Sequence, residues 1–142
     1  MSFGGIKRTP ADIAFSKTVR EANDYVCEYC GIQGRSSPST MDLSHYFGRR
    51  HRSTRWEPLN AFCLCRGCHN KLGESPHDHA TWARKMLGEG AYKILVEKKN
   101  QIVKIPKTEE KAIAKHYREE YKKLLARRAA GATGKLNFVG YF

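Results

Sequence analysis

A chain of 142 residues and 16.2 kDa is long enough for one compact domain with an extension, and too short for two domains with separate large cores. Hydrophobic residues make up 40% and charged residues 28%, which excludes wholesale disorder and provides for a modest core. No apolar run approaches the roughly 18–20 residues of a membrane span, and the N-terminus lacks the apolar stretch of a secretory signal. We therefore expect a soluble intracellular protein.

The net charge is strongly positive and unevenly distributed along the chain. Lysine and arginine total 26 against 14 acidic residues, which gives a formal charge of +12 and a pI of about 9.7. Residues 92–142 hold 13 basic and 5 acidic side chains, and so carry +8 of this total. A small protein with such a charge usually has a polyanionic partner. We expect nucleic acid, and rank an acidic membrane surface below it because no strongly hydrophobic amphipathic helix accompanies the charge.

The first predicted element is a helix over residues 9–23. Thr9 fits the N-cap position, Pro10 the first turn, and Asp12 the acidic start of a helix. The apolar side of this helix would consist of Ile13, Ala14, Val19 and Ala22. The polar stretch 33–40 contains glycine and proline, which predicts a loop before the next element.

Two strands separated by an arginine-rich loop are predicted next. Residues 41–47 alternate like a strand, with Leu43 and His45 on one side and Asp42 and Ser44 on the other. A loop over 48–56 carries four arginines within seven positions, and a second strand is predicted over 58–65. A short helix is expected to begin near Cys68 and to end near Gly73.

The remainder of the chain is predicted to be mainly helical. One helix covers 78–87, with Trp82 and Met86 on one face and Gly88 as its stop, and a second covers 89–99. Residues 101–105 alternate as in a strand, but Pro106 restricts them to a sheet edge or an extended linker. A long helix begins at Thr108 and ends at glycines 131 and 134, before an irregular tail. Its apolar stripe is Ile113, Tyr117, Tyr121, Leu124 and Leu125, and its opposite, basic face is Lys111, Lys115, Arg118 and Lys122.

Five cysteines occur in the chain, and four of them form two CxxC pairs. An odd number of cysteines in a reducing compartment argues against a closed disulfide framework. Two such knuckles match a tetrahedral zinc site, because each aims two thiolates at one ion about 2.3 Å away. We therefore predict a structural Zn²⁺ held by Cys27, Cys30, Cys65 and Cys68, with a redox pair or buried thiols as the alternatives. Cys63 is interpreted as a core residue, with replacement of a ligand as the alternative.

An ordered set of polar residues lies around these pairs. His45 is followed by Asn60 fifteen residues on and by His69 nine residues further. This order resembles the HNH nucleases, also called ββα-metal or His-Me finger endonucleases, over about residues 26–72. The longer string SHYFGRRHRSTRWEPLNAFCLCRGCH is similar to the phage NinG/Rap family of recombination endonucleases, and it extends the resemblance weakly over residues 10–129.

The resemblance implies an α+β fold with a small zinc-stapled, treble-clef-like ββα-metal core, flanking helices and a C-terminal basic helix. It divides the chain into an N-terminal helical segment (1–26), a nuclease core (27–88) and a basic helical extension with a tail (89–142). It further implies a metal-dependent endonuclease for branched or recombination-intermediate DNA, such as D-loops and Holliday junctions. Such a protein would be encoded by a phage and would act in the cytoplasm of a bacterial host, without a membrane partner.

On the matching positions, the resemblance implies roles in phosphodiester hydrolysis. His45 would be the general base that activates water. Asn60 would hydrogen-bond across the hairpin and hold the His45 segment in place, and His69 would bind a catalytic Mg²⁺ or Mn²⁺. The alternatives are a buried strand histidine at position 45 and a fourth zinc ligand at position 69.

One position departs from the HNH pattern. In many HNH proteins an aspartate that binds the metal precedes the general base, and here that position is Ser44, whose hydroxyl is a poor ligand for a hard cation. The missing ligand is expected from Asp42, His77, Asp78 or His79, or from water and the DNA, although 77–79 equally fit a helix N-terminus. Ser44 also favours the alternative function, a non-catalytic zinc-dependent nucleic-acid-binding module with a degenerate HNH core.

The arginine-rich loop is the predicted DNA-facing surface. Arg49, Arg50, Arg52 and Arg55 can fork onto phosphates, and Trp56 either stacks on an exposed base or fills the core of the hairpin. The basic face of the last helix is a second phosphate track or an ordinary solvated face. The apolar stripe of that helix packs on the domain or forms a homodimer suited to a two-fold junction.

Overall fold

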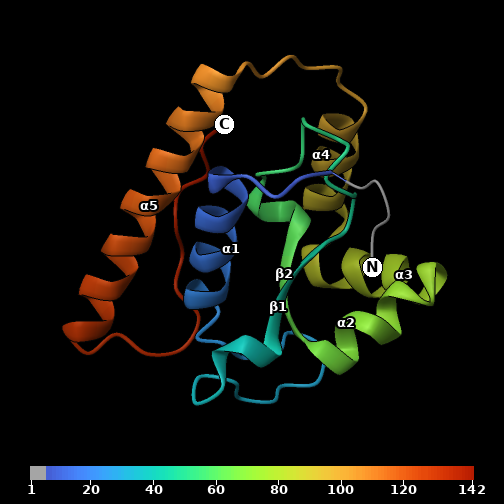
Figure 1. Ribbon diagram of the computed structural model, residues 1–142. Coiled ribbons are helices and arrows are strands. Elements are labelled where there is room, and N and C mark those ends of the chain that lie inside the picture. Colours follow the sequence, from blue (N-terminus) through green and yellow to red (C-terminus); the bar gives the residue numbers. More distant parts are fainter. Residues whose placement is uncertain (1–5) are drawn as a thin grey trace.

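The computed structural model describes residues 6–142, and residues 1–5 of the expected N-terminal segment lie outside this part. Within it, a two-stranded antiparallel sheet and five α-helices form the α+β arrangement that the sequence predicted (Figure 1). The elements in chain order are α1 (Pro10–Ala22), β1 (Met41–His45), β2 (Ala61–Cys65), α2 (Arg66–Gly73), α3 (Pro76–Leu87), α4 (Glu89–Lys99) and α5 (Lys107–Ala129). None of these helices combines the length and the apolar character that crossing a membrane requires.

Helix α1 begins where the sequence predicted because its first turn is capped. Thr9 is the N-cap residue, and the side chains of Thr9 and Asp12 each bond the backbone of the other. The predicted apolar side is partly wrong, because Ile13 is 44% exposed whereas Phe15 is fully buried. Helix α1 lies between α5 and the hairpin, and its buried residues are those that face these two neighbours (Figure 1).

Strands β1 and β2 form a hairpin in which Met41 lies opposite Cys65 and His45 lies opposite Ala61. Both strands are shorter than predicted. The second strand begins late because Pro58–Asn60 forms a turn of 3₁₀ helix, and the first ends at His45, where the chain enters the long arginine-rich loop. The hairpin therefore presents His45 at the end of a strand, next to the loop.

The two helices predicted between residues 78 and 99 are present, but some of their bounds and buried residues differ from the prediction. Helix α3 begins at Pro76, two residues before the predicted start, and α4 covers the predicted range. Met86 is 45% exposed and does not share the half-buried environment of Trp82. Residues 101–105 are an extended linker and not a strand, and Ile102 is 99% exposed.

Helix α5 packs along α1. Ile113, Tyr117 and Leu124 of the predicted apolar stripe are buried, whereas Leu125 at its margin is 41% exposed. The hydroxyl of Thr18 in α1 donates a hydrogen bond of 3.0 Å to the carbonyl oxygen of Tyr117. The stripe thus packs on the domain, which is the first of the two alternatives that the sequence left open.

The tail after α5 folds back onto the same two helices. The Leu136 N–H donates to the Ala22 carbonyl over 2.7 Å, and the Tyr141 N–H donates to the Tyr117 hydroxyl over 3.1 Å. The tail contains no helix or strand, as predicted, and Figure 1 shows it returning alongside α1 and α5. It is a packed part of the structure, because Leu136 is only 8% exposed.

Candidate functional site

Four cysteine sulfurs from two separate turns come together at one end of the hairpin. The Sγ atoms of Cys27, Cys30, Cys65 and Cys68 all lie within 4.8 Å of one another, and those of Cys30 and Cys65 are 3.8 Å apart. Four bonds of 2.3 Å in a tetrahedron place the sulfurs about 3.8 Å apart. The cluster, which joins the turn after α1 to the junction of β2 and α2, therefore could hold a metal ion.

The first knuckle is shaped by backbone hydrogen bonds. The Cys30 N–H donates to the Cys27 sulfur over 3.4 Å. Burial raises the pKa of Cys27, but the backbone amides that point at its sulfur, those of Cys30, Cys65 and Tyr29, outweigh burial and lower the pKa to about 7. A thiolate is the form that binds metal. The arrangement therefore favours the ligand form of Cys27 near neutral pH.

Cys63 lies outside this cluster, as the sequence predicted. It is fully buried in the core, and burial raises its pKa to about 12, with the charges of Glu28 and Cys27 adding to the effect. Its backbone pairs with Glu28 in both directions: the Cys63 N–H donates to Glu28 Oε2 over 2.7 Å, and the Glu28 N–H donates to the Cys63 carbonyl over 2.8 Å. This pair ties the first knuckle to β2.

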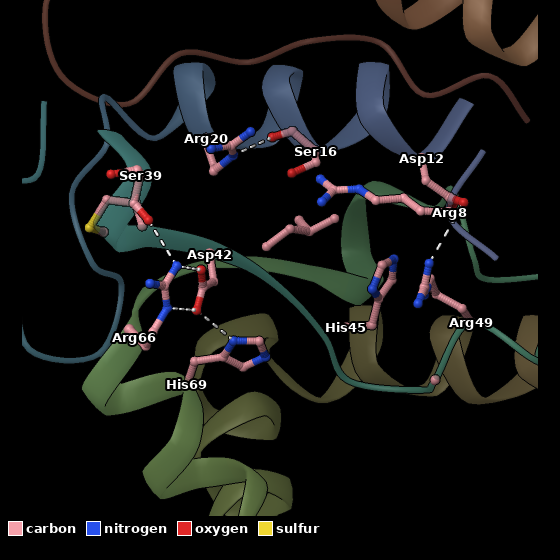
Figure 2. Close-up of a pocket in the computed structure, with 13 residues that line it drawn as sticks. Arg8, Asp12, Ser16, Arg20, Ser39, Asp42, His45, Arg49, Arg66 and His69 are labelled. Atoms are coloured by element: carbon pink, nitrogen blue, oxygen red, sulfur yellow. Dashed lines mark hydrogen bonds and ion pairs between the residues drawn. The ribbon is translucent and has the colours of Figure 1, made fainter. Parts of the chain in front are cut away.

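A polar cleft of about 670 Å³ lies between α1 on one side and β1, the arginine-rich loop and α2 on the other (Figure 2). His45 and His69 line this same cleft, although they are 24 positions apart in the chain. The remaining lining residues are Arg8, Asp12, Ser16, Arg20, Ser39, Met41, Asp42, Leu43, Gly48, Arg49 and Arg66. The structure thus brings the two predicted histidines to one surface that is rich in arginine.

The imidazole of His45 is oriented by a backbone carbonyl. Its Nε2 atom lies 3.0 Å from the carbonyl oxygen of Arg55. A carbonyl only accepts hydrogen bonds, so Nε2 carries the proton and Nδ1 has a free lone pair in the neutral ring. Burial lowers the pKa of His45, and the hydrogen bond to Arg55 and the charge of Asp12 oppose this only in part. His45 is therefore a neutral imidazole at pH 7 whose Nδ1 can accept a proton.

Asn60 closes the loop that carries this carbonyl. Its Oδ1 accepts a hydrogen bond of 2.7 Å from the Phe47 N–H, and its Nδ2 donates to the carbonyls of Phe47 and Thr54 over 2.9 and 3.0 Å. The side chain is fully buried. Asn60 therefore holds both ends of the loop between the two strands, next to His45.

His69, in α2, is paired with a carboxylate from β1. Its Nδ1 lies 3.0 Å from Oδ2 of Asp42, and Arg66 donates to Oδ1 of the same carboxylate over 2.8 Å. Burial raises the pKa of Asp42, but the partners Arg66 and His69 outweigh burial and the pKa is lowered. Asp42 is therefore a carboxylate at neutral pH, in contact with the predicted metal ligand.

Two residues of the predicted DNA-facing surface are instead part of the core. Arg55 is 3% exposed, which contradicts its predicted role on the DNA-facing surface. Trp56 is 0% exposed and lies in the core, which is the second of the two alternatives that the sequence left open. Both bond the buried Asp12: Arg55 through Nε over 3.0 Å and through its terminal nitrogen over 2.6 Å, and Trp56 through Nε1 over 3.1 Å. The sequence analysis treated Asp12 only as a helix-start signal. In the structure it anchors the loop whose carbonyl orients His45.

The other basic residues named from the sequence lie in different places. Arg49 lines the cleft 3.9 Å from the Asp12 carboxylate, and Arg50 is exposed. Arg52 donates to the Ile105 carbonyl and to Glu110, so its guanidinium holds the linker before α5. The basic face of α5, which consists of Lys111, Lys115, Arg118 and Lys122, is exposed and does not line the cleft.

The alternative metal ligands after α2 also lie outside the cleft. His77 and Asp78 are exposed in the first turn of α3. His79 is half-buried, with its ring 5.1 Å from that of Tyr46, and burial lowers its pKa. Of the candidates that could replace an aspartate at position 44, Asp42 alone lines the cleft with His69.

The buried pair of Asp12 and Arg55 leads to a stability prediction. Burial raises the pKa of Asp12, but hydrogen bonds from Arg55 and Thr9 outweigh burial and hold the pKa below its ordinary value of 3.8. Arg55→Met would leave this carboxylate buried without its main partner. We expect the free energy of unfolding in urea at pH 7 to fall by about 3–5 kcal/mol.

The exposed Arg50 provides the control, since Arg50→Met should change stability by less than about 0.5 kcal/mol. Because the folded-state pKa of Asp12 is lowered, the contribution of the pair is complete above pH 3.8 and is lost as the pH falls through the folded-state pKa. The difference in free energy of unfolding between Arg55→Met and the wild type should therefore become smaller in that acidic range. The prediction would be contradicted if Arg55→Met and Arg50→Met unfolded at the same urea concentration at pH 7.

The chain matches no protein-family model, no curated protein and no solved structure.

Proposed function

We propose that the protein is a metal-dependent DNA endonuclease of the HNH class with a structural zinc. The observation that carries the proposal is that His45 and His69 line one arginine-rich cleft, with a free Nδ1 on the first and a carboxylate partner on the second. Figure 2 displays both rings directed into this cleft. Hydrolysis of a phosphodiester needs a base for the attacking water and positive charge around the phosphate, and the cleft offers both.

In this proposal His45 accepts a proton from water at Nδ1, while its Nε2 keeps the bond to the Arg55 carbonyl. Asn60 is a positioning residue, because it holds the ends of the loop and does not line the cleft. Arg49 contributes positive charge close to His45. His45 and Arg49 together place a base and a phosphate-binding group in the same cleft.

Asp42 and His69 are the residues that would hold the catalytic Mg²⁺ or Mn²⁺. Their facing atoms are 3.0 Å apart. In the structure this contact is a hydrogen bond, and Arg66 bonds the same carboxylate. Adjacent ligands of an octahedral ion with bonds of 2.0–2.1 Å are about 2.9 Å apart, so an ion that replaced the shared proton would have both ligand atoms at a suitable separation. When bound, the ion supplies Lewis-acid stabilisation of the phosphate and of the departing oxygen. Asp42 thus takes the place of the aspartate that the HNH pattern puts at Ser44.

The four clustered cysteines would hold zinc, because a Cys₄ tetrahedron with short knuckles is the usual structural site of that ion. The net charge of +12 supports a nucleic-acid substrate. The preference for branched DNA such as D-loops or Holliday junctions and the action in a phage-infected bacterial cytoplasm rest on the resemblance to the NinG/Rap family. A homodimer was expected from the apolar stripe of α5, and because that stripe packs on α1 it gives the homodimer no support.

The test is a cleavage assay with purified protein on duplex, flap, D-loop and four-way-junction DNA, in Mg²⁺ or Mn²⁺ and with EDTA as a control. We expect cleavage that depends on the added metal and is fastest on a branched substrate. Cleavage that persists in EDTA would contradict metal dependence. Equal rates on all four substrates would contradict the proposed substrate class.

The proposed ligand set leads to a second expected result. Asp42→Ala should raise the Mg²⁺ or Mn²⁺ concentration needed for half-maximal cleavage by at least about tenfold, because one of two protein ligands is lost. Asp78→Ala is the matched control, because Asp78 is exposed in α3 outside the cleft. A titration of cleavage rate against metal concentration gives the half-maximal metal concentration of each variant. The role of Asp42 would be contradicted if this concentration were unchanged in Asp42→Ala or raised in Asp78→Ala.

The second candidate function is a non-catalytic zinc-dependent module that binds nucleic acid. The observation that favours it concerns Ser44, which is 2% exposed and does not line the cleft, so the usual aspartate position contributes nothing there. In addition, the cysteine cluster is the one group of three or more metal-binding side chains within residues 6–142. Tight binding to the same DNA panel without cleavage in any metal would favour this function.

A further inference from the structure

We propose that helix α1 forms the second wall of a track for one DNA strand, in which Arg8 and Arg20 bind phosphates on either side of the reacting position. The cleft would then hold the strand between two pairs of arginines, one pair at each end. The position of the reacting phosphate rests on the proposed function, whereas the track itself rests on the charge and shape of the cleft.

The spacing of residues along α1 creates this wall. Asp12, Ser16 and Arg20 follow one another at intervals of four within α1, and residues four apart lie on one side of a helix. Arg8 immediately precedes the N-cap Thr9, and all four of these residues line the cleft. From Asp12 to Arg20 the helix rises about 12 Å, which corresponds to about three to four nucleotides at a rise of 3.4 Å. The interval-of-four pattern is visible in the sequence, but only the fold shows that this side of α1 faces His45 and His69.

The arginines form two pairs across the cleft. Figure 2 shows Arg8 and Arg49 at the end that carries His45, and Arg20 and Arg66 at the end that carries Asp42. Arg8 and Arg20 come from the α1 side, whereas Arg49 follows β1 and Arg66 begins α2. A strand that passes between the two walls therefore meets an arginine from each side at both ends, and at the Asp42 end Arg66 is ion-paired with that carboxylate whereas Arg20 is not.

The cleft keeps a positive charge after its internal ion pairs are considered. Its four arginines face two aspartates, and the first of these, Asp12, is already neutralised by the buried Arg55. Arg8 is exposed and forms no hydrogen bond or ion pair within the described part of the chain. Among residues 6–142, Arg20 donates a hydrogen bond to the Ser16 carbonyl over 3.2 Å and pairs with no carboxylate. Arg8 and Arg20 are therefore available for an anion.

The chemistry of the lining identifies the ligand as a sugar–phosphate backbone. No phenylalanine, tyrosine or tryptophan occurs among the described residues that line the cleft. The aromatic rings of this lining are the imidazoles of His45 and His69, which are held by the Arg55 carbonyl and by Asp42. Arginine is suited to bidentate contacts with phosphate. Phosphate contacts position a strand but carry no sequence information. The track is therefore expected to bind a DNA strand in the same way whatever its sequence.

The test compares the salt dependence of binding in two double variants of the full chain. Fluorescence anisotropy with labelled single-stranded oligonucleotides of two unrelated sequences gives the affinity at several NaCl concentrations. The slope of log K against log[salt] is negative, and each phosphate contact on a single strand contributes about −0.7 to it. Removing two contacts should therefore reduce the magnitude of the slope by about 1.4. We expect this decrease for Arg8→Gln/Arg20→Gln, with both sequences affected equally.

The matched control is Lys17→Gln/Lys93→Gln, which removes the same charge from exposed positions of α1 and α4 that do not line the cleft. It should keep the slope of the wild type. Arg8→Lys/Arg20→Lys should have a salt slope close to that of the wild type, because the positive charges remain. The proposed track would be overturned if Arg8→Gln/Arg20→Gln and Lys17→Gln/Lys93→Gln had equal salt slopes. It would also be overturned if the slope changed for only one of the two oligonucleotide sequences.

The track and the nuclease activity can fail separately. If the wild type binds DNA and cuts none, but the slope falls only in Arg8→Gln/Arg20→Gln, the nuclease proposal is wrong and the track is supported. If the wild type cuts DNA and Arg8→Gln/Arg20→Gln keeps both its slope and its cleavage rate, the track is wrong and the nuclease proposal is unaffected.

Discussion

Replacing His45 with alanine is expected to lower the rate of metal-dependent DNA cleavage by about 10²–10⁴-fold, the usual contribution of a positioned general base. The structural reason is that Nε2 of His45 bonds the Arg55 carbonyl, which leaves Nδ1 as the proton acceptor in the cleft. Metal content and DNA affinity should stay close to those of the wild type, because His45 belongs neither to the cysteine cluster nor to the arginines of the cleft.

The measurement is a single-turnover cleavage rate, with zinc content and DNA affinity determined on the same preparation. His51→Ala is the control, because His51 lies in the same loop and does not line the cleft. It should cut at nearly the wild-type rate. A wild-type rate in His45→Ala would show that His45 is not the base. A loss of zinc or DNA binding in that variant would instead point to a structural role for the side chain.

The pH dependence of the wild type provides a second readout of the same role. Burial lowers the pKa of His45 below its ordinary value of 6.5, so the neutral ring persists to a lower pH than in an isolated histidine. The acid limb of the single-turnover rate should therefore have its midpoint below pH 6.5. An acid limb centred above that value would mean that another group controls the reaction.

The second large effect is expected at the cysteine cluster. Cys68→Ser should abolish stoichiometric zinc binding and lower the free energy of unfolding by several kcal/mol, a large part of the roughly 5–15 kcal/mol of a typical domain. Cys68 lies in the first turn of α2, immediately before His69. Loss of the metal would therefore release the helix that carries one of the two cleft histidines.

Cys63→Ala is the matched control for this variant. Its thiol is buried in the core outside the cluster, so the change should leave one zinc bound and lower stability by only about 1 kcal/mol. Zinc content and urea unfolding measure both effects. Full zinc content and an unchanged unfolding midpoint in Cys68→Ser would contradict a structural metal at the cluster.

The parts of the fold that depend on near neighbours in the chain could be predicted from the sequence. The capping pair Thr9 and Asp12 determines where α1 begins, and the two CxxC turns determine which sulfurs can meet. The hairpin followed from alternation, although the turn at Pro58–Asn60 shortened β2. These signals are reliable because their hydrogen bonds and turn geometry lie within a few residues.

The candidate site was predicted less completely, because its environment comes from distant segments. His45, Asn60 and His69 were identified from their order in the chain, but the partners of the two histidines were not. Asp42 was one of several possible metal ligands, and its position beside His69 distinguishes it only in the folded hairpin. The arginine-rich loop shows the same limit, because its four arginines have four different environments.

Composition and local spacing were enough to predict the helices, the hairpin, the four cysteines of the cluster and the excess of positive charge. Which arginines face the cleft and which are buried depends on the packing of distant segments. Arg55 and Trp56 are internal because Asp12, 43 and 44 positions away, draws them into the core, and Arg8 and Arg20 face the histidines because α5 and the hairpin orient α1. A charged side chain is buried only when a distant segment supplies its partner, and no local pattern reveals that partner.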